Sequence, residues 1–182
     1  MHNTKKSLFR IIIFVIILLF PFYIFATDSS LPKGYGSVQL GMTLEQAKAA
    51  LEDDPAYGYR GESDVSILHG ENRNLITTEG VLFFEDCWFQ FDNDRLYIIT
   101  LNLNPEQIDY YSIFSKLCEK YGQPDSLSPQ KSEWNNGSIK MTLERPLVLK
   151  YTDVAIFNEL QESSNVRNTA EEYNRQLFLD SL

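Results

Sequence analysis

The chain has 182 residues, of which 43% are hydrophobic and 23% are charged. These values are ordinary for a globular protein with its own core. Removal of an N-terminal segment, residues 1–26, takes away three basic and no acidic side chains, which leaves 13 basic and 25 acidic side chains and a net charge of −12. A chain this acidic is repelled by phosphate backbones and by anionic lipid surfaces. The composition therefore excludes nucleic acid as a partner.

The first 26 residues have the pattern of a secretory signal peptide. A short basic region is followed by the apolar residues 11–25, and Ala26 offers a cleavage site before polar residues. Pro21 interrupts the apolar run, which is shorter than the ~20 residues that a membrane-spanning helix needs. We therefore expect cleavage and a periplasmic protein. The alternative is an uncleaved anchor that holds the protein in the inner membrane facing the periplasm, and this segment is the only membrane contact that we expect.

The rest of the chain predicts an α+β domain. Residues 27–36 form a tether, and residues 37–153 are two tandem modules, 37–103 and 104–153, each a helix followed by antiparallel strands. We expect the modules to form one sheet with helices packed on one face. The acidic residues 154–182 then form a docked helix or a loose tail.

Each predicted helix has start and stop signals. Thr43 and Gln46 have the spacing of a capping box, and Pro55 ends this first helix. The second helix is predicted to begin at Asn104-Pro105 and to end at Gly122. Its apolar face is predicted to hold Ile108, Tyr111, Phe114, Leu117, Cys118 and Tyr121.

Each module is predicted to contain a hairpin with a two-residue turn, Asn93-Asp94 in the first and Asn136-Gly137 in the second. The predicted pairs are Asp92–Arg95, Phe91–Leu96 and Phe89–Ile98, then Trp134–Ile139, Glu133–Lys140 and Ser132–Met141. The two hairpins align without gaps around their turns, which indicates an internal repeat, although any two hairpins share some of this likeness. Residues 56–80 lengthen the first module, and 65–68 and 75–78 are predicted as short strands.

These registers divide the sheet into two faces. The apolar face, which the helices are expected to cover, holds Cys87, Phe89, Phe91, Leu96 and Ile98, continued by Trp134, Ile139, Met141 and Leu143. The open face mixes aromatic and charged side chains, as an interaction surface requires. We expect a protein partner to bind there, through Trp88, Gln90, Tyr97, Ile99 and Lys140. The alternative is that residues 154–182 or the insertion 56–80 cover Trp88 and Tyr97.

Signals for catalysis, metals or cofactors are missing. The exported part has one histidine, His69, in a predicted loop, and there is no Cys-x-x-Cys, His-Glu-x-x-His or glycine-rich phosphate motif. The two exported cysteines, Cys87 and Cys118, form a disulfide or remain as two buried thiols, and either role is structural. We therefore expect neither an enzyme nor a bound cofactor or metal.

A resemblance to known families rests on a few residues. Gly41-Met42-Thr43 before a helix resembles the opening of the SmpA/OmlA-type modules of outer-membrane-assembly lipoproteins. It is also similar to the tandem modules of β-lactamase inhibitor proteins. Both families continue with a Gly-x-Pro exit from the helix and an aromatic-rich hairpin, which are matched in the other module by Gly122-Gln123-Pro124 and Trp134. The lipid-attachment cysteine of the lipoproteins is missing.

The resemblance implies a non-catalytic protein-binding role in the bacterial cell envelope, as an adaptor or accessory factor. The alternative is a periplasmic protein that binds a small ligand or lipid, with an apolar pocket beneath residues 56–80.

Overall fold

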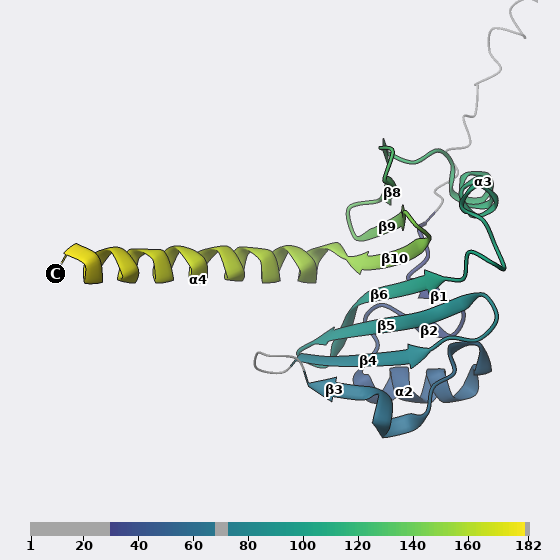
Figure 1. Ribbon diagram of the computed structural model, residues 1–182, viewed down its shortest axis with the longest axis horizontal. Coiled ribbons are helices and arrows are strands. Elements are labelled where there is room, and N and C mark those ends of the chain that lie inside the picture. Colours follow the sequence, from purple (N-terminus) through teal and green to yellow (C-terminus); the bar gives the residue numbers. More distant parts are fainter. Residues whose placement is uncertain (1–29, 68–72, 181–182) are drawn as a thin grey trace, which may run out of the picture.

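The computed structural model describes residues 30–67 and 73–180, and it confirms the α+β class. Within these residues the fold consists of an eight-stranded antiparallel sheet, a two-stranded ribbon and three α-helices (Figure 1). The predicted signal peptide and His69 lie outside the described residues. No helix in the described ranges combines the length and the apolar character needed to cross a membrane.

The chain places its strands in the order β3-β4-β5-β6-β10-β9-β8-β7. The strands are β3 (Val65–Ile67), β4 (Arg73–Glu79), β5 (Phe84–Asp92), β6 (Arg95–Leu103), β7 (Ser126–Leu127), β8 (Lys131–Asn135), β9 (Ile139–Glu144) and β10 (Val148–Asp153). The ribbon is β1 (Gly34–Tyr35) and β2 (Val38–Gln39), and the helices are α2 (Leu44–Asp53), α3 (Tyr110–Tyr121) and α4 (Val154–Asp180). Two short 3-10 turns, Pro55–Tyr57 and Gly61–Asp64, follow α2.

The two halves of the sheet have the same plan. Helix α2 precedes β3 to β6, helix α3 precedes β7 to β10, and the last strand of each half, β6 and β10, pair antiparallel at the centre. The division of the chain into two modules stays a prediction. Their origin as an internal repeat stays a prediction.

The main core lies between one face of the sheet and the helices α2 and α3. It contains Ala47 and Leu51 of α2 and fully buried sheet residues such as Phe89, Phe91 and Met141, with the apolar side of α3 packed against it. The third helix, α4, behaves differently. Its first turns pack on the opposite face and the rest extends away from the body (Figure 1). Of the two forms expected for residues 154–182, the start of α4 is therefore a docked helix.

The start of α2 follows the sequence prediction. The Gln46 amide donates to Thr43 Oγ1 at 3.2 Å and the Thr43 amide donates to Gln46 Oε1 at 3.0 Å, which completes the capping box. The Leu44 amide also donates to Asp94 Oδ1 at 2.9 Å. This bond ties the helix to the β5–β6 turn, 50 residues away in sequence.

The predicted start of α3 is wrong, because Asp109 and not Asn104 caps the helix. The Asp109 carboxylate accepts from the amide and the hydroxyl of Ser112, at 3.0 and 2.5 Å, and these bonds lower the pKa of Asp109. The helix begins at Tyr110, whose side chain points to the sheet, with its hydroxyl 3.0 Å from Ser132 Oγ. Tyr111, predicted on the apolar side, is 75% exposed.

A β-bulge makes the register of the first hairpin differ from the predicted one. Asp92 pairs with Arg95 and Phe91 with Leu96 as predicted, but beyond them Gln90 pairs with Ile98 and Phe89 with Ile99. The extra residue in β6 is Tyr97, and one extra residue exchanges the faces of every residue that follows it. Ile99 is therefore fully buried in the main core, and Ile98 lies on the opposite face. The predicted faces of both residues are wrong.

The second hairpin has a longer loop than predicted. Asn136 Oδ1 accepts from the amides of Ser138 and Ile139, at 3.1 and 2.8 Å, which closes a four-residue loop over 136–139. Trp134 consequently pairs with Met141 and not with Ile139. Glu133 pairs with Thr142 and Ser132 with Leu143. Because each pair shifts by two residues, every side chain keeps its predicted face.

The predicted strands of the insertion are confirmed as β3 and β4, and β4 extends the sheet beyond β5. Cys87 and Cys118 are free thiols in the structure. Cys87 is fully buried in the core, where desolvation raises its pKa to about 12. Cys118 is half-buried on α3.

We expect a thiol reagent such as 5,5′-dithiobis(2-nitrobenzoate) at pH 8 to label Cys118 in the native protein and to leave Cys87 untouched. Burial removes Cys87 from the reagent, and its raised pKa keeps it as the unreactive thiol. Colorimetric counting should give one thiol before and two after denaturation, and Cys118→Ser should reduce the native count to zero. A count of zero in the unreduced, denatured protein would instead reveal a disulfide.

Candidate binding groove on the open sheet face

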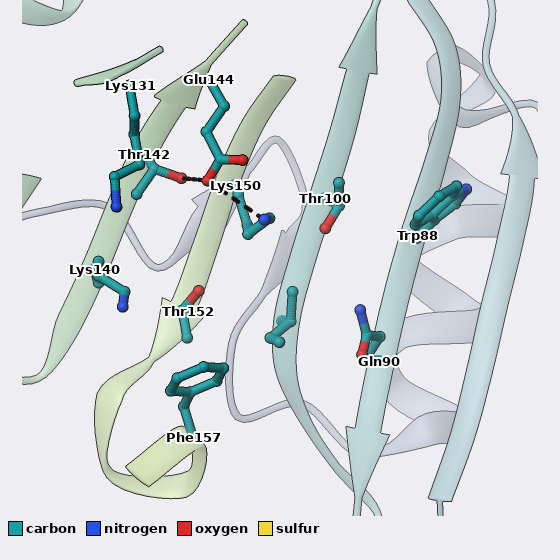
Figure 2. Close-up of a pocket in the computed structure, with 11 residues that line it drawn as sticks. Trp88, Gln90, Thr100, Lys131, Lys140, Thr142, Glu144, Lys150, Thr152 and Phe157 are labelled. Atoms are coloured by element: carbon teal, nitrogen blue, oxygen red, sulfur yellow. Dashed lines mark hydrogen bonds and ion pairs between the residues drawn. The ribbon is translucent and has the colours of Figure 1, made fainter. Parts of the chain in front are cut away.

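A groove of about 240 Å³ lies on the sheet face that α2 and α3 leave uncovered (Figure 2). Its walls come from β5, β6, β8, β9 and β10 and from the first turn of α4. The lining side chains are Trp88, Gln90, Ile98, Thr100, Lys131, Lys140, Thr142, Glu144, Lys150, Thr152 and Phe157. Three of the five predicted partner-binding residues, Trp88, Gln90 and Lys140, are thus brought together here.

Strand pairing places a row of side chains across the middle of the groove. Trp88 pairs with Thr100, Thr100 with Lys150, and Lys150 with Thr142. Neighbouring strands lie ~4.8 Å apart, so two strand spacings separate the indole of Trp88 from the ammonium-bearing side chain of Lys150. An aromatic anchor and a cation therefore lie within reach of one short peptide segment.

Alternation along the strands explains why these side chains point outward. Trp88 stands between the fully buried Cys87 and Phe89, and Lys150 stands between the buried Leu149 and Tyr151. Successive side chains of a strand point to opposite faces, so burial of the neighbours in the main core directs Trp88 and Lys150 to the open face. Trp88 remains 42% exposed there.

The groove has an excess of cations. Lys150 Nζ lies 3.4 Å from Glu144, which also accepts from the Thr142 hydroxyl at 2.9 Å (Figure 2). Lys131 Nζ lies 2.8 Å from Glu133. In the described part of the chain no carboxylate pairs with Lys140. Its ammonium lies 5.1 Å from the centre of the Phe157 ring.

The Phe157 contact is a cation–π interaction, which leaves the charge of Lys140 uncompensated. Three ammonium groups therefore face two carboxylates at this end of the groove. This local excess of positive charge contrasts with the acidic chain as a whole.

Helix α4 covers part of the open face. Its first turn is capped by Asp153, which accepts from the amides of Ala155 and Ile156 at 3.1 and 3.2 Å. Tyr97 and Ile98 are buried beneath this part of α4, with Ile156, Phe157 and Leu160 as their neighbours. The alternative that the C-terminal segment covers the face therefore holds for Tyr97, whereas Trp88 stays exposed.

Two of the predicted site residues thus have other roles. Tyr97 lies in the small cluster under α4, and its hydroxyl donates to Gln90 Oε1 at 3.4 Å, which holds the Gln90 carboxamide at the groove wall. Ile99 lies in the main core, because the bulge at Tyr97 reverses its face. Neither side chain is available to a partner.

The sequence reasoning missed Lys131, Lys150 and Phe157. Lys150 carried a usable signal, since it alternates with Leu149 and Tyr151. The positions of Lys131 and Phe157 depend on the pairing of β8 with β9 and on the path of α4, which no local pattern reports. Within residues 30–67 and 73–180, no group of three or more histidine, cysteine or carboxylate side chains is arranged to hold a metal ion.

Comparison with known proteins gives a family and nothing beyond it. No curated protein and no solved structure matches the chain. The sequence model of one family, described as the TP0088 domain, matches residues 33–163. This match includes the ribbon, the eight strands of the described sheet and the first turns of α4 that cover Tyr97, and it ends within α4. Since the match spans more than half of the chain, the chain belongs to the TP0088 domain family.

Proposed function

We propose that the protein is a non-catalytic adaptor or accessory factor of the bacterial cell envelope, which binds a partner protein through the open sheet face. One observation carries the proposal. Trp88, 42% exposed, stands in one groove with three lysines, on a sheet face that α4 covers only in part. Tryptophan is among the residue types that most often dominate the binding energy of protein interfaces.

The charges of the groove favour a particular kind of partner segment. Lys140 has an uncompensated charge, and Lys131 and Lys150 lie on neighbouring strands. A segment with one or two carboxylates and an apolar side chain would pair with the ammonium groups while its apolar side chain covers Trp88. The net charge of −12 repels large acidic bodies at long range, so the acidic group of the partner must be local.

The cell compartment belongs to the same proposal. The signal-peptide pattern of residues 1–26 supports export to the periplasm, or an inner-membrane anchor if the segment is retained. The resemblance to SmpA/OmlA-type modules and to β-lactamase inhibitor proteins supports a protein partner, because both groups act by binding other proteins. An inhibitor that blocks its target through the open face is a variant of this proposal.

Affinity capture from crosslinked envelope extract tests the proposal. We expect one dominant envelope protein to be captured by the tagged protein and to be lost with Trp88→Ala, because truncation of the indole removes the apolar anchor. Tyr111→Ala is the matched control, since Tyr111 is an exposed aromatic residue on α3, away from the groove. Lys140→Glu should weaken capture as well, and more strongly at low salt.

The captured protein should then be purified and titrated against each variant. Equal affinity for the Trp88→Ala and Tyr111→Ala variants would place the binding surface elsewhere and refute the role of the groove. A folded protein that captures no partner at all would refute the adaptor function itself.

A further inference from the structure

A second hollow lies on the opposite side of the sheet, next to the start of α3. It has a volume of about 310 Å³ and lies between β1, the end of β6, β10 and helix α3. Its lining is made of aliphatic and aromatic side chains: Tyr35, Phe83, Phe84, Leu101, Leu103, Ile108, Ile113 and Leu149. The volume is at the lower end of the ~300–1,000 Å³ typical of ligand pockets.

The chemistry of the lining limits what can enter. No charged side chain lines the cavity, and the Tyr35 hydroxyl is the only side-chain polar group of the lining residues. A peptide segment would bury amide groups without hydrogen-bond partners, which is costly, and ordered water needs several polar partners that this lining does not offer. Hydrocarbon is the chemistry that fits.

The mouth of the cavity continues this apolar surface. Tyr35 and Phe83 are about half exposed, and the neighbouring loop presents Val81 and Leu82, the latter 71% exposed. The loop is fixed by backbone bonds, since the Val81 amide donates to the Ala56 carbonyl at 3.0 Å.

Leu82 itself has a φ of 59°, a conformation that leucine rarely adopts. Residues in such sparsely populated conformations cluster at functional sites, ligand-binding sites among them. The part of a hydrocarbon chain that emerges from the cavity would lie against Val81, Leu82 and Phe83.

We propose that this cavity binds the alkyl chain of a single-chain amphiphile, whose head group stays in water at the mouth. The volume suits one chain and not the two chains of a bilayer phospholipid. The sequence analysis placed an apolar pocket beneath residues 56–80, whereas none of those residues lines this cavity. Because the groove lies on the other face of the sheet, the amphiphile and a protein partner can be bound together.

Isothermal titration calorimetry with neutral alkyl glucosides of six to ten carbons, below their micelle concentrations, tests the proposal. The uncharged head group removes any contribution from the acidic surface. Each added methylene should tighten binding about fourfold while the cavity fills, and affinity should level off once the chain is longer than the cavity. Constant affinity across the series, or no binding, would overturn the proposal.

Two cavity-filling variants locate the site. Ile113→Phe places extra volume in the cavity and should weaken octyl glucoside binding at least tenfold, whereas Leu117→Phe, one turn along α3 and outside the lining, should leave it unchanged. If Ile113→Phe lowers the melting temperature, Ile108→Phe replaces it as the cavity-filling variant. Unchanged binding by the folded filling variant would overturn the proposal, and so would binding to phosphatidylcholine vesicles without binding to monomeric glucoside, which would indicate a membrane-docking surface.

Discussion

Trp134→Ala is expected to lower the free energy of unfolding by about 3–5 kcal/mol, the range for removal of a large aromatic side chain from a core. Trp134 is 2% exposed, and its indole N–H donates to the Gly122 carbonyl at 2.9 Å. Its ring centre lies 6.2 Å from that of Phe114. One side chain thus joins β8, the middle of α3 and the residue that ends α3. Urea unfolding followed by circular dichroism measures the change.

Two further variants show where this stability comes from. Trp134→Phe retains much of the packing but leaves the Gly122 carbonyl without its donor, so the expected loss is smaller than for alanine. Tyr111→Ala removes an exposed ring from α3 and should change the free energy of unfolding by no more than about 0.5 kcal/mol. A loss below about 1 kcal/mol for Trp134→Ala would contradict the packing of α3 on the sheet.

Ile99→Ala is the second change with a large expected effect, a loss of about 2–5 kcal/mol of stability. Ile99 is fully buried in the main core and pairs with Phe89 on one side and Tyr151 on the other. The same strand without a bulge would place Ile99 on the open face, where truncation costs little. Thermal and urea unfolding of the variant therefore measure whether the bulge at Tyr97 exists.

Trp88→Ala is the matched comparison for Ile99→Ala. Trp88 lies on the adjacent strand but is 42% exposed, so its truncation should cost clearly less stability than that of Ile99 while it removes partner binding. The opposite order, with a stable Ile99→Ala and an unfolded Trp88→Ala, would show that the two faces are exchanged.

Local chemistry made part of the fold predictable. The Thr43–Gln46 box, the Asp92–Arg95 pair and the alternation along β5 and β8 are short-range patterns, and the structure contains each of them. The errors arose where two local signals compete or where a tertiary contact decides. Asn104-Pro105 is a valid helix start, but the side chain of Asp109 forms the cap that phases α3 so that Tyr110 points inward.

Tertiary contacts also decide the position of the bulge and the composition of the groove. No residue near Tyr97 predicts a bulge, because Leu96 and Ile98 on either side are apolar and equally compatible with a regular strand. Trp88 and Lys140 could be predicted on the groove face from alternation alone. Lys150 joins them in one groove only because β6 pairs with β10. That pairing depends on contacts between distant parts of the chain, and no sequence pattern within either strand predicts it.

The central pairing of β6 with β10 also sets an order of folding. Strands β3 to β6 form a run of neighbours along the chain, and so do β7 to β10, whereas the β6–β10 pair joins residues roughly fifty positions apart. Local pairings close small loops and form early, and distant ones pay a larger loop-closure entropy. As the chain emerges amino end first, the edge of β6 must wait uncovered until residue 153 is available. During that interval β6 can pair with a strand of another molecule, so this topology carries a risk of aggregation while the protein folds.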